Sequence, residues 1–528
     1  MSDRRSPRTT SDLLLSAVRG RSGGAAAVAR MLPDWTRAIC RQHGLLPGTV
    51  DLAHYSHWAG RSFSSFDAAA FHYLAVGSGR GWSPRAGFSP ADYCRQNPDV
   101  ALAGYEPFAH WLRFGREEGR GAAAPTDPPP PDIRHLLGHR RPDMAHATVD
   151  VVIPVYGGRA LALQAIDSVL GSATREAFEL VVVDDASPDP LLRSELQALA
   201  AAGLVTLIEN KRNVGFVGAV NRGVALHPAR DIVLLNSDAR VFGDWLDRLM
   251  TALRTPRTAT ATPLSNAATI LSYPATLCEN RLPADVDIAL WDRLCAANDM
   301  PVVEVPTGVG FCMAVRRACL DQIGAFDEEL FGRGYGEEND FCFRATAAGW
   351  RHVGATGLFV WHRGGASFGD ERKTLVEAAQ STIETLHPGY AATVGRFIRD
   401  DPLAAARRAL DVARVRADSR RKRLSFESFG PAEVETPGER DVLDILLVPD
   451  LPPYAGQYRL VPQGLGAVPN LPRCGPTTTP DSLAALLSDL GIVEFGGGKG
   501  GAAAAALSRK LQGAMERSTN GGAAANGL

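Results

Sequence analysis

The feature that most constrains the fold is an alternation of strand-like and helix-like segments between residues 149 and 238. Short apolar runs are predicted to be strands, and the amphipathic stretches between them are predicted to be helices. The predicted strands are 149–156, 178–187, 205–210 and 231–238, and the predicted helices are 160–173, 191–203 and 214–227. Alternation at this spacing indicates an α/β fold in which helices cover the faces of a parallel sheet.

Acidic side chains lie at the ends of two of these predicted strands. Asp184 and Asp185 end the second strand, and Asp238 ends the fourth. Ligands of open α/β sheets bind outside the carboxyl ends of the strands. We therefore expect a ligand site at this edge of the sheet.

Length and composition exclude several classes of protein. A chain of 528 residues is expected to contain more than one domain. Its formal net charge of −2 gives no global indication of nucleic-acid binding. The eight cysteines form no CxxC pair, which is typical of a reduced, cytoplasmic protein. No secretory signal and no run of about 18 apolar residues is found, so we expect at most a peripheral association with the inner face of a membrane.

An internal repeat lies near the N-terminus. Residues 55–81 and 93–119 match with a shift of 38 residues, and the pattern is an aromatic helix that ends on glycine. Repeats of this length usually form stacked helical units. We interpret them as a packing or docking module, with sugar or cell-wall binding as the alternative. The repeated histidines His72 and His110 are interpreted as packing or capping groups.

These observations divide the chain into six predicted segments. A proline-rich stretch, APTDPPPPD, begins the linker after the repeats. The last segment contains strand-like VLDILLVPDL and a low-complexity tail, which together suggest a truncated or degenerate second domain. The segments are a helical or flexible N-terminus (1–49), the repeat module (50–124), the linker (125–147), the α/β domain (148–372), a helical extension (373–425) and the C-terminal segment (426–528).

Three short motifs contain side chains suited to chemistry. Asp238 follows a strand, where a carboxylate can bind a divalent cation or can cap a helix. Glu337 and Glu338 begin a predicted helix, where they are candidates for a general base or are simply acids favoured by the helix dipole. Asp340 and Arg344 are four residues apart and are predicted to pair. His362 ends a strand and is either a metal ligand or a structural hydrogen-bonding group.

Several motifs in a fixed order resemble those of family 2 glycosyltransferases. They include VVIPVYGG, VVVDDASPD, LLNSDARV, TPLSNAATI, PTGVGFCMAVRR, the GYGEEND region and the final HRGGASFG, and they span about 220 residues. The resemblance implies a GT-A fold, in which a mixed nucleotide-binding sheet is flanked by helices. It also implies a nucleoside-diphosphate sugar as donor and a divalent metal, Mn²⁺ or Mg²⁺, as cofactor.

The resemblance also assigns roles to individual residues. Asp238 and His362 would bind the metal, and Glu338 would be the catalytic base with Glu337 as the alternative. Gly308 and Gly310 would allow close approach of a sugar. The family's metal motif often begins with Asp where this chain has Asn236. The donor side would be formed by Pro154, Val155, Tyr156, Asp184, Asp185, Asn213, Asn221, Asn236 and Ser237.

The implied function is transfer of a hexosyl or deoxyhexosyl group, with inversion, to a saccharide or lipid-linked acceptor. Synthesis of a cell-surface polysaccharide or O-antigen is the expected context. One alternative is a nucleotidyltransferase, which requires a basic glycine-rich phosphate loop after the first strand, where this chain has only Arg159. The other is a non-catalytic nucleotide-sugar-binding or scaffold protein, in which the base or metal residues would be expected to be lost.

Overall fold

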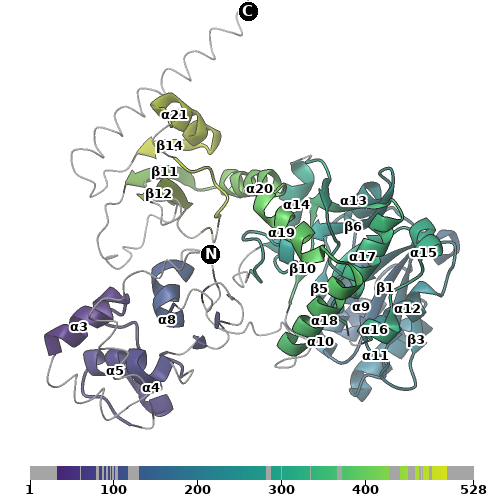
Figure 1. Ribbon diagram of the computed structural model, residues 1–528, viewed down its shortest axis with the longest axis horizontal. Helices are drawn as coiled ribbons and strands as arrows, with labels where there is room; N and C mark the ends of the chain where they lie inside the picture. Colours follow the sequence, from purple (N-terminus) through teal and green to yellow (C-terminus); the bar gives the residue numbers. More distant parts are fainter. Residues whose placement is uncertain are drawn as a thin grey trace, which may run out of the picture. The chain divides into compact units, whose positions relative to one another are not determined.

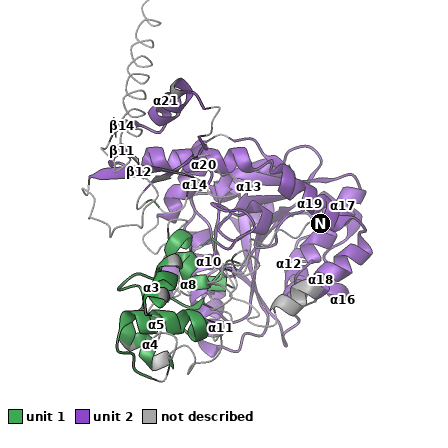
Figure 2. Cartoon of the chain, turned by 60° about the vertical axis from the view of Figure 1, so that its left-hand side comes forward, with its two compact units in different colours: residues 1–126, 280–284, 465–467 green, residues 127–279, 285–464, 468–528 purple. Residues whose placement is uncertain are grey.

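The chain folds into two compact units. The computed structural model describes residues 33–59, 61–78, 82–85, 88–90, 93–94, 97, 100, 105–116, 120, 130–280, 287–298, 300–332, 334–364, 372–426, 441–449, 458–462, 465, 468–474 and 478–495 (Figure 1). One unit contains residues 1–126, 280–284 and 465–467, and the other contains residues 127–279, 285–464 and 468–528 (Figure 2).

The first unit is helical, and it has the same local arrangement twice. In each repeat a tyrosine hydroxyl lies 2.9 Å from the Nδ1 atom of a buried histidine 17 residues later, in the pairs Tyr55–His72 and Tyr93–His110. These contacts agree with the packing role predicted for the histidines. The described elements are α3 (Pro33–Gln42), α4 (Leu52–Ala59), α5 (Phe66–His72), η1 (Tyr73–Gly77), α8 (Pro107–His110) and η3 (Trp111–Gly115).

Each repeat also needs a glycine beside its tyrosine. A Cβ atom at Gly77 would lie 2.3 Å from the Tyr55 hydroxyl oxygen, and one at Gly115 would lie 2.1 Å from that of Tyr93. Only glycine allows its own backbone to approach the tyrosine ring this closely. The glycine that ends each repeat motif therefore has a steric cause.

Substituting Gly77 with alanine is expected to destabilise the first unit by about 1–3 kcal/mol, the usual cost of overpacking a core. Tyr55→Phe removes the hydroxyl oxygen that causes the closest clash. In a double-mutant cycle, the combined variant should therefore lose less stability than the sum of the two single variants. Calorimetric unfolding of the four full-length proteins measures this coupling, and strictly additive losses would contradict the steric explanation.

The second unit is built on an eight-stranded mixed sheet with the order β3-β2-β1-β4-β8-β6-β9-β7. β1, β2, β3 and β4 are parallel, whereas β8 runs antiparallel to both β4 and β6. The strands are β1 (Val149–Val155), β2 (Phe178–Asp184), β3 (Thr206–Glu209), β4 (Asp231–Leu235), β6 (Thr258–Leu264), β7 (Val303–Val305), β8 (Cys312–Val315) and β9 (Arg351–Phe359).

Helices flank this sheet, as Figure 1 shows, and the predicted α/β class is confirmed. Every residue of β1, β2 and β6 is buried, and the apolar runs within β1 and β2 are typical of strands covered on both faces. The helices are α9 (Ile133–Leu137), α10 (Arg159–Leu170), α11 (Pro190–Ala201), α12 (Phe216–Val224), α13 (Trp245–Leu253), α14 (Ile288–Ala297), α15 (Arg317–Ile323), α16 (Glu328–Phe331), α17 (Glu337–Ala347), α18 (Arg372–Leu386), α19 (Tyr390–Asp400) and α20 (Ala404–Ala417), with short 3₁₀ turns at Met144–His146 and Thr269–Leu271.

A two-stranded sheet joins two segments that are far apart in the sequence. β5 (Ala239–Arg240) pairs antiparallel with β10 (Trp361–His362), and His362 is the partner of Ala239. The backbone N–H of Arg363 also donates to the carbonyl oxygen of Asp238, at 2.9 Å. This pairing fixes the end of the motif LLNSDARV beside the end of GLFVWH.

The C-terminal segment forms a four-stranded sheet of order β13-β12-β11-β14 with one helix, α21 (Pro480–Asp489). Its strands are β11 (Arg421–Phe426), β12 (Val442–Pro449), β13 (Tyr458–Pro462) and β14 (Ile492–Phe495). The helical prediction for residues 373–425 is therefore wrong from Arg421 onward. Its basic side chains suit a helix end, but β11 pairs in parallel with both β12 and β14, contacts that local sequence does not reveal.

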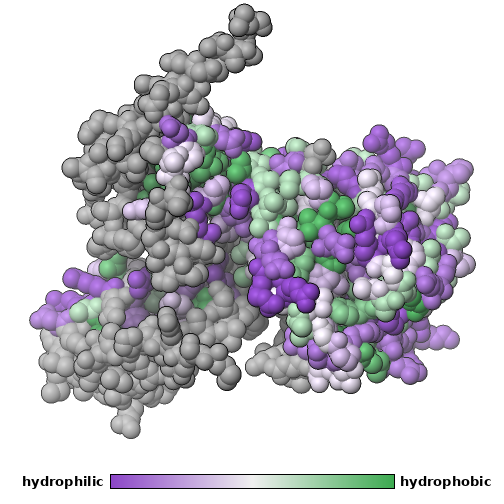
Figure 3. All heavy atoms as spheres, turned by 45° about the horizontal axis from the view of Figure 1, so that its top comes forward, coloured by the Kyte–Doolittle hydropathy of each residue, from purple (hydrophilic) through white to green (hydrophobic). Residues whose placement is uncertain are grey.

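Hydrophilic and hydrophobic residues are interspersed on the face of the molecule drawn in Figure 3. Within the described parts of the chain, no helix combines the length and the apolar character needed to cross a bilayer.

Candidate active site

The carboxylates at the end of β2 hold the neighbouring loops in place. Asp185 accepts hydrogen bonds from the side chain of Asn210 at 2.8 Å and from the backbone N–H groups of Val214 and Gly215 at 2.9 and 3.0 Å. Asp184 accepts from the backbone N–H of Ser187 at 3.0 Å. Both carboxylates are buried. These contacts shape the loops at the carboxyl edge of the sheet, and nucleotide contact by either residue stays a prediction.

The other residues predicted on the donor side have mixed positions. Val155 is buried within β1, whereas the next residue, Tyr156, is 57 % exposed at the strand end. Asn213 bonds the N–H of Gly215 at 2.9 Å and so shapes the start of α12. The side chain of Asn221 donates to the carbonyl oxygen of Phe326 at 2.8 Å, which ties α12 to the chain before α16. Pro154 lies beside Val155 in β1.

Asp238 and His362 face each other at the edge of the sheet. The Nε2 atom of His362 lies 3.2 Å from Oδ1 of Asp238, and both side chains are largely buried, at 14 % and 13 % exposure. The structure thus brings together the two residues predicted to bind a metal, although 124 sequence positions separate them (362 − 238). The ring of His362 is stacked on Phe311, with centroids 4.9 Å apart.

The hydrogen bonds of His362 determine which of its nitrogens can bind a cation. Nδ1 lies 2.7 Å from the carbonyl oxygen of Ala267, so Nδ1 must carry a hydrogen and donate it. In a neutral ring, Nε2 then presents a lone pair toward the Asp238 carboxylate. Such an arrangement is favourable only if the ring is protonated or if a cation lies between the two groups.

The pKa shifts of Asp238 and His362 agree with a site that favours positive charge between the two groups. Burial alone would raise the pKa of Asp238, but the neighbouring His362 holds it below the usual range. Burial alone would lower the pKa of His362, but Asp238 outweighs this and raises it. The pair therefore favours an added positive charge, which a proton supplies here and a divalent cation would supply equally well.

Asn236 lies two residues before Asp238 in the sequence and carries a further candidate ligand atom. Its Oδ1 atom is buried and has no hydrogen-bond partner, while its backbone is fixed by a 2.7 Å bond from its N–H to the carbonyl oxygen of Phe311. A buried acceptor without a partner is costly and calls for an explanation. Carboxylate, amide and imidazole groups together suit Mn²⁺ or Mg²⁺, so the residues present fit the predicted cation. Ser237 lies between Asn236 and Asp238 and is half-buried.

Glu337 and Glu338 begin α17 after a glycine-rich turn. Gly334 and Gly336 have φ values of +98° and +100°, which favour glycine, and Gly336 is the N-terminal cap of the helix. Both glutamates have a buried Oε2 atom without a hydrogen-bond partner. Buried polar atoms without a partner are rare in folded proteins, so two such oxygens at the start of one helix mark it as a candidate functional site.

The pKa values of both glutamates are raised, and that of Glu337 is raised more. Burial and the adjacent Glu338 raise the pKa of Glu337 well above its usual value. Burial also raises the pKa of Glu338, but hydrogen bonds with the backbone at Glu338 and Gly336 and with the Glu337 side chain oppose this rise. Since two adjacent buried carboxylates disfavour double ionisation, this difference favours protonation of Glu337 before Glu338. This electrostatic difference agrees with the prediction that Glu338 is the base.

A short loop connects the glutamates with the Asp238–His362 pair. A Cβ atom at Gly310 would lie 3.8 Å from Oε1 of Glu337, and the next residue, Phe311, is stacked on His362. Gly308, in the same loop, has no room for a side chain, because a Cβ atom there would lie 2.5 Å from the sulfur of Met313. The loop thus lies between the Asp238–His362 pair and the two glutamates, and it contacts Glu337 on one side and His362 on the other.

Asp340 and Arg344 belong to the scaffold, as predicted from their spacing. Nε of Arg344 bonds Oδ2 of Asp340 at 2.7 Å, and Oδ1 of Asp340 lies 2.8 Å from Nε2 of His387. Arg344 also donates to the carbonyl oxygens of Ile323 and Ala325. These bonds hold α17 against the segments before and after it.

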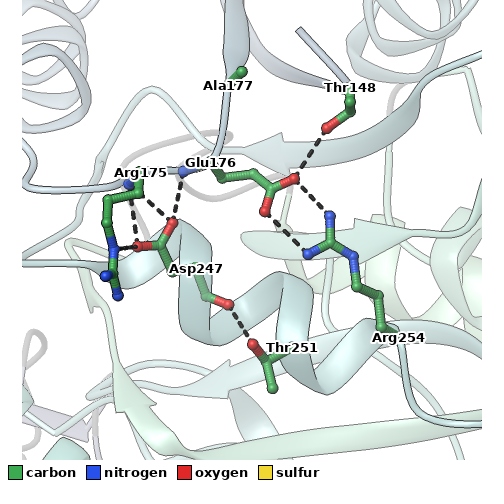
Figure 4. Close-up of a pocket in the computed structure, with 7 residues that line it drawn as sticks. All are labelled: Thr148, Arg175, Glu176, Ala177, Asp247, Thr251 and Arg254. Atoms are coloured by element: carbon green, nitrogen blue, oxygen red, sulfur yellow. Dashed lines mark hydrogen bonds and ion pairs between the residues drawn. The ribbon is translucent and has the colours of Figure 1, made fainter.

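A separate pocket lies at the opposite edge of the sheet, before β1 and β2. Figure 4 shows that its charged groups bond one another: Arg254 pairs with Glu176 at 2.5 Å, and Asp247 accepts from the backbone N–H groups of Arg175 and Glu176. Because these groups are already satisfied, the pocket is not the candidate active site. It is lined by Thr148, Arg175, Glu176, Ala177, Asp247, Thr251 and Arg254.

The sequence did not reveal the residues that orient His362. The carbonyl oxygen of Ala267 accepts from the ring, and Asn266 exchanges two hydrogen bonds with the His362 backbone, at 2.7 and 2.9 Å. Both residues belong to the motif TPLSNAATI, which carried the family resemblance without an assigned role. Membership in that motif was the sequence feature that could have identified Asn266 and Ala267 as functional residues.

Comparison with protein families gives one match. Residues 150–324 match the model of "Glycosyl transferase family 2". This range includes Asp184, Asp185 and Asp238 but ends before Glu338 and His362.

Curated relatives are distant. An "N-acetylgalactosaminyltransferase 7" of Drosophila melanogaster is 27 % identical over 225 residues, which are 39 % of this chain and 37 % of the relative. The chain thus spans little more than a third of that relative. An "N-acetylglucosaminyl-diphospho-decaprenol L-rhamnosyltransferase" of Mycobacterium tuberculosis is 25 % identical over 283 residues, which are 48 % of this chain and 90 % of the relative.

Solved structures are similar only at a low level. A mannosyltransferase from Pyrobaculum calidifontis, in complex with GDP-Man and Mn²⁺, has 16 % identity and a TM-score of 0.35 over 53 % of this chain and 79 % of the other. The structure of GalNAc-T7 with UDP, GalNAc and Mn²⁺ has 20 % identity and a TM-score of 0.33 over 41 % of this chain and 44 % of the other.

Proposed function

We propose that this chain transfers a sugar from a nucleoside-diphosphate sugar to an acceptor hydroxyl, as the match of residues 150–324 to the family 2 glycosyltransferase model suggests. The geometry of His362 carries the proposal. Its Nδ1 atom donates to the carbonyl oxygen of Ala267, so its Nε2 atom faces Asp238 at 3.2 Å. The adjacent glutamates Glu337 and Glu338 form a second arrangement. The first arrangement suits a cation that binds a diphosphate, and the second suits proton transfer.

The proposed reaction is a single displacement with inversion. The ionised Glu338 accepts the proton of the acceptor hydroxyl, and the resulting oxygen attacks the anomeric carbon of the donor. The bond between that carbon and the phosphate oxygen breaks, and the nucleoside diphosphate departs with the electron pair. Asn236, Asp238 and His362 would hold a divalent cation, which would supply charge neutralisation for the departing diphosphate. Glu337 keeps its proton and hydrogen-bonds Glu338.

The substrate class follows from the relatives and remains part of the proposal. Two of the relatives are named for transfer of N-acetylgalactosamine and of L-rhamnose, the latter to a lipid-linked diphosphate. We propose a hexosyl or deoxyhexosyl donor and a saccharide or lipid-linked acceptor, in synthesis of a surface polysaccharide or O-antigen. The cytoplasmic face of the membrane is the proposed location.

A panel of UDP-, dTDP- and GDP-sugars, each with and without Mn²⁺, tests the proposed function. We expect at least one donor to raise the unfolding temperature only when the metal is present, and to release nucleoside diphosphate when an acceptor is added. If no donor stabilises the protein and none is hydrolysed or transferred under any metal condition, the proposal is wrong.

A further inference from the structure

A second group of potential metal ligands lies away from the candidate active site. Nε2 of His139 lies 2.7 Å from Oδ1 of Asp167, and Nε2 of His135 lies 3.3 Å from the same oxygen. The two imidazole rings have centroids 5.1 Å apart. All three ligand atoms lie within 4.8 Å of one another. From this geometry we infer that His135, His139 and Asp167 form a binding site for a divalent transition-metal ion such as Zn²⁺.

The backbone holds these side chains on two neighbouring elements. His135 lies in the last turn of α9, and His139 follows Gly138, which caps the end of that helix. Asp167 lies in the last turn of α10. Gly171, just beyond α10, leaves room for the ring of His139, because a Cβ atom there would lie 3.3 Å from its Cε1 atom. The site is therefore built by the end of α9 and the end of α10.

The surroundings allow a cation to enter. Side-chain exposure is 63 % for His135, 17 % for His139 and 29 % for Asp167, so the group is open to solvent on one side. In the described parts of the chain, the Asp167 carboxylate has no arginine or lysine partner and contacts only these two rings. Without a metal, one carboxylate oxygen must serve as acceptor for both imidazoles.

A comparison within the molecule shows what would prevent metal binding. Asp150, Glu179 and His227 also lie close enough together to bind an ion. There, however, the guanidinium of Arg230 already occupies the centre, at 2.8 Å from Asp150 and 2.6 Å from Glu179. That group has its own positive charge and is not a metal site.

The ligand types select the ion. Two imidazole nitrogens and one carboxylate oxygen suit Zn²⁺ and similar borderline ions, whereas Mg²⁺ and Mn²⁺ prefer oxygen ligands. Zinc would bind at about 2.0–2.2 Å from each ligand atom, which small rotations of these side chains allow, and a water molecule would complete a tetrahedron. The bound ion would link α9, which lies within the predicted linker, to α10.

Zinc titration of the full-length, chelator-treated protein tests this inference. The Asp238→Asn background removes a ligand of the candidate active site, so that zinc retained there does not obscure the result. The test variant is His135→Ala, whose exposed side chain is not needed for packing, with Asp167→Asn as a second variant. The matched control is His146→Ala, an 81 % exposed histidine that pairs only with Asp143 across a single turn.

We expect about one zinc ion per chain to be retained after desalting by the background protein and by the His146→Ala control, together with a rise in unfolding temperature on zinc addition. Both effects should be reduced at least tenfold in His135→Ala and in Asp167→Asn. Equal zinc content in all four proteins, or no retained zinc in any of them, would overturn the assignment. Neither result bears on sugar transfer, so this site and the proposed function can fail separately.

Discussion

Replacing Glu338 with glutamine is expected to lower the rate of sugar transfer by about 10²–10⁴, the usual contribution of a general base. Glutamine has nearly the same shape but cannot accept the acceptor hydroxyl's proton. The affinity for the donor should change little, because the proposed cation ligands Asp238 and His362 are untouched. The rate of nucleoside diphosphate release at saturating donor, measured beside donor binding, checks both parts.

Glu337→Gln is the matched control for this change. The pKa of Glu337 is raised more than that of Glu338, so a neutral glutamine amide is expected to replace a protonated Glu337. We expect this variant to keep most of its activity near neutral pH. If instead Glu337→Gln is inactive and Glu338→Gln is active, the roles of the two residues are reversed. Glu329→Gln, an exposed acid on α16, controls for the loss of charge alone.

Replacing Asp238 with asparagine is expected to weaken the Mn²⁺-dependent part of donor binding strongly. Loss of a residue that only hydrogen-bonds a metal ligand typically costs roughly 10- to 100-fold in metal affinity, and loss of a ligand itself should cost more. The substitution removes the carboxylate charge that faces Nε2 of His362. Without that charge, the remaining amide and imidazole groups bind a hard divalent ion poorly. Titration of the donor with and without Mn²⁺ measures the loss.

The control for Asp238→Asn is Asp321→Asn, an exposed carboxylate on α15. It should bind donor and Mn²⁺ as the unchanged protein does. Asn266→Ala offers a graded test, because Asn266 holds the backbone of His362 without facing the cation. Its effect should be smaller than that of Asp238→Asn; a larger one would place the main contribution in the loop and not in the carboxylate.

The sheet and its binding edge could be predicted from the sequence because local patterns carry them. Buried parallel strands contain continuous apolar runs; Asp184 ends such a run, and Asp238 lies three residues after another. The proximity of Asp238 and His362 followed from the order of the motifs, whose resemblance to one family implied a shared site. The antiparallel pairing of β5 with β10 is the contact that creates this proximity.

Other features depend on contacts that the sequence does not show. Nucleotide contact by Asp185 stays a prediction, whereas the bonds of its two oxygens to the backbone at Val214 and Gly215 could not be read from the sequence. The strand that begins at Arg421 was predicted to be helical because its partners in the sheet lie far along the chain. The raised pKa values of Glu337 and Glu338 depend on burial, which the order of residues alone does not give.

One donor titration, carried out with and without Mn²⁺ and followed by a transfer assay on the same samples, tests the account most directly. It compares the unchanged protein, Glu338→Gln and Asp238→Asn. We predict that Glu338→Gln keeps Mn²⁺-dependent donor binding and loses transfer, whereas Asp238→Asn loses both. Normal Mn²⁺-dependent binding and transfer in Asp238→Asn, or full transfer by Glu338→Gln, would contradict it.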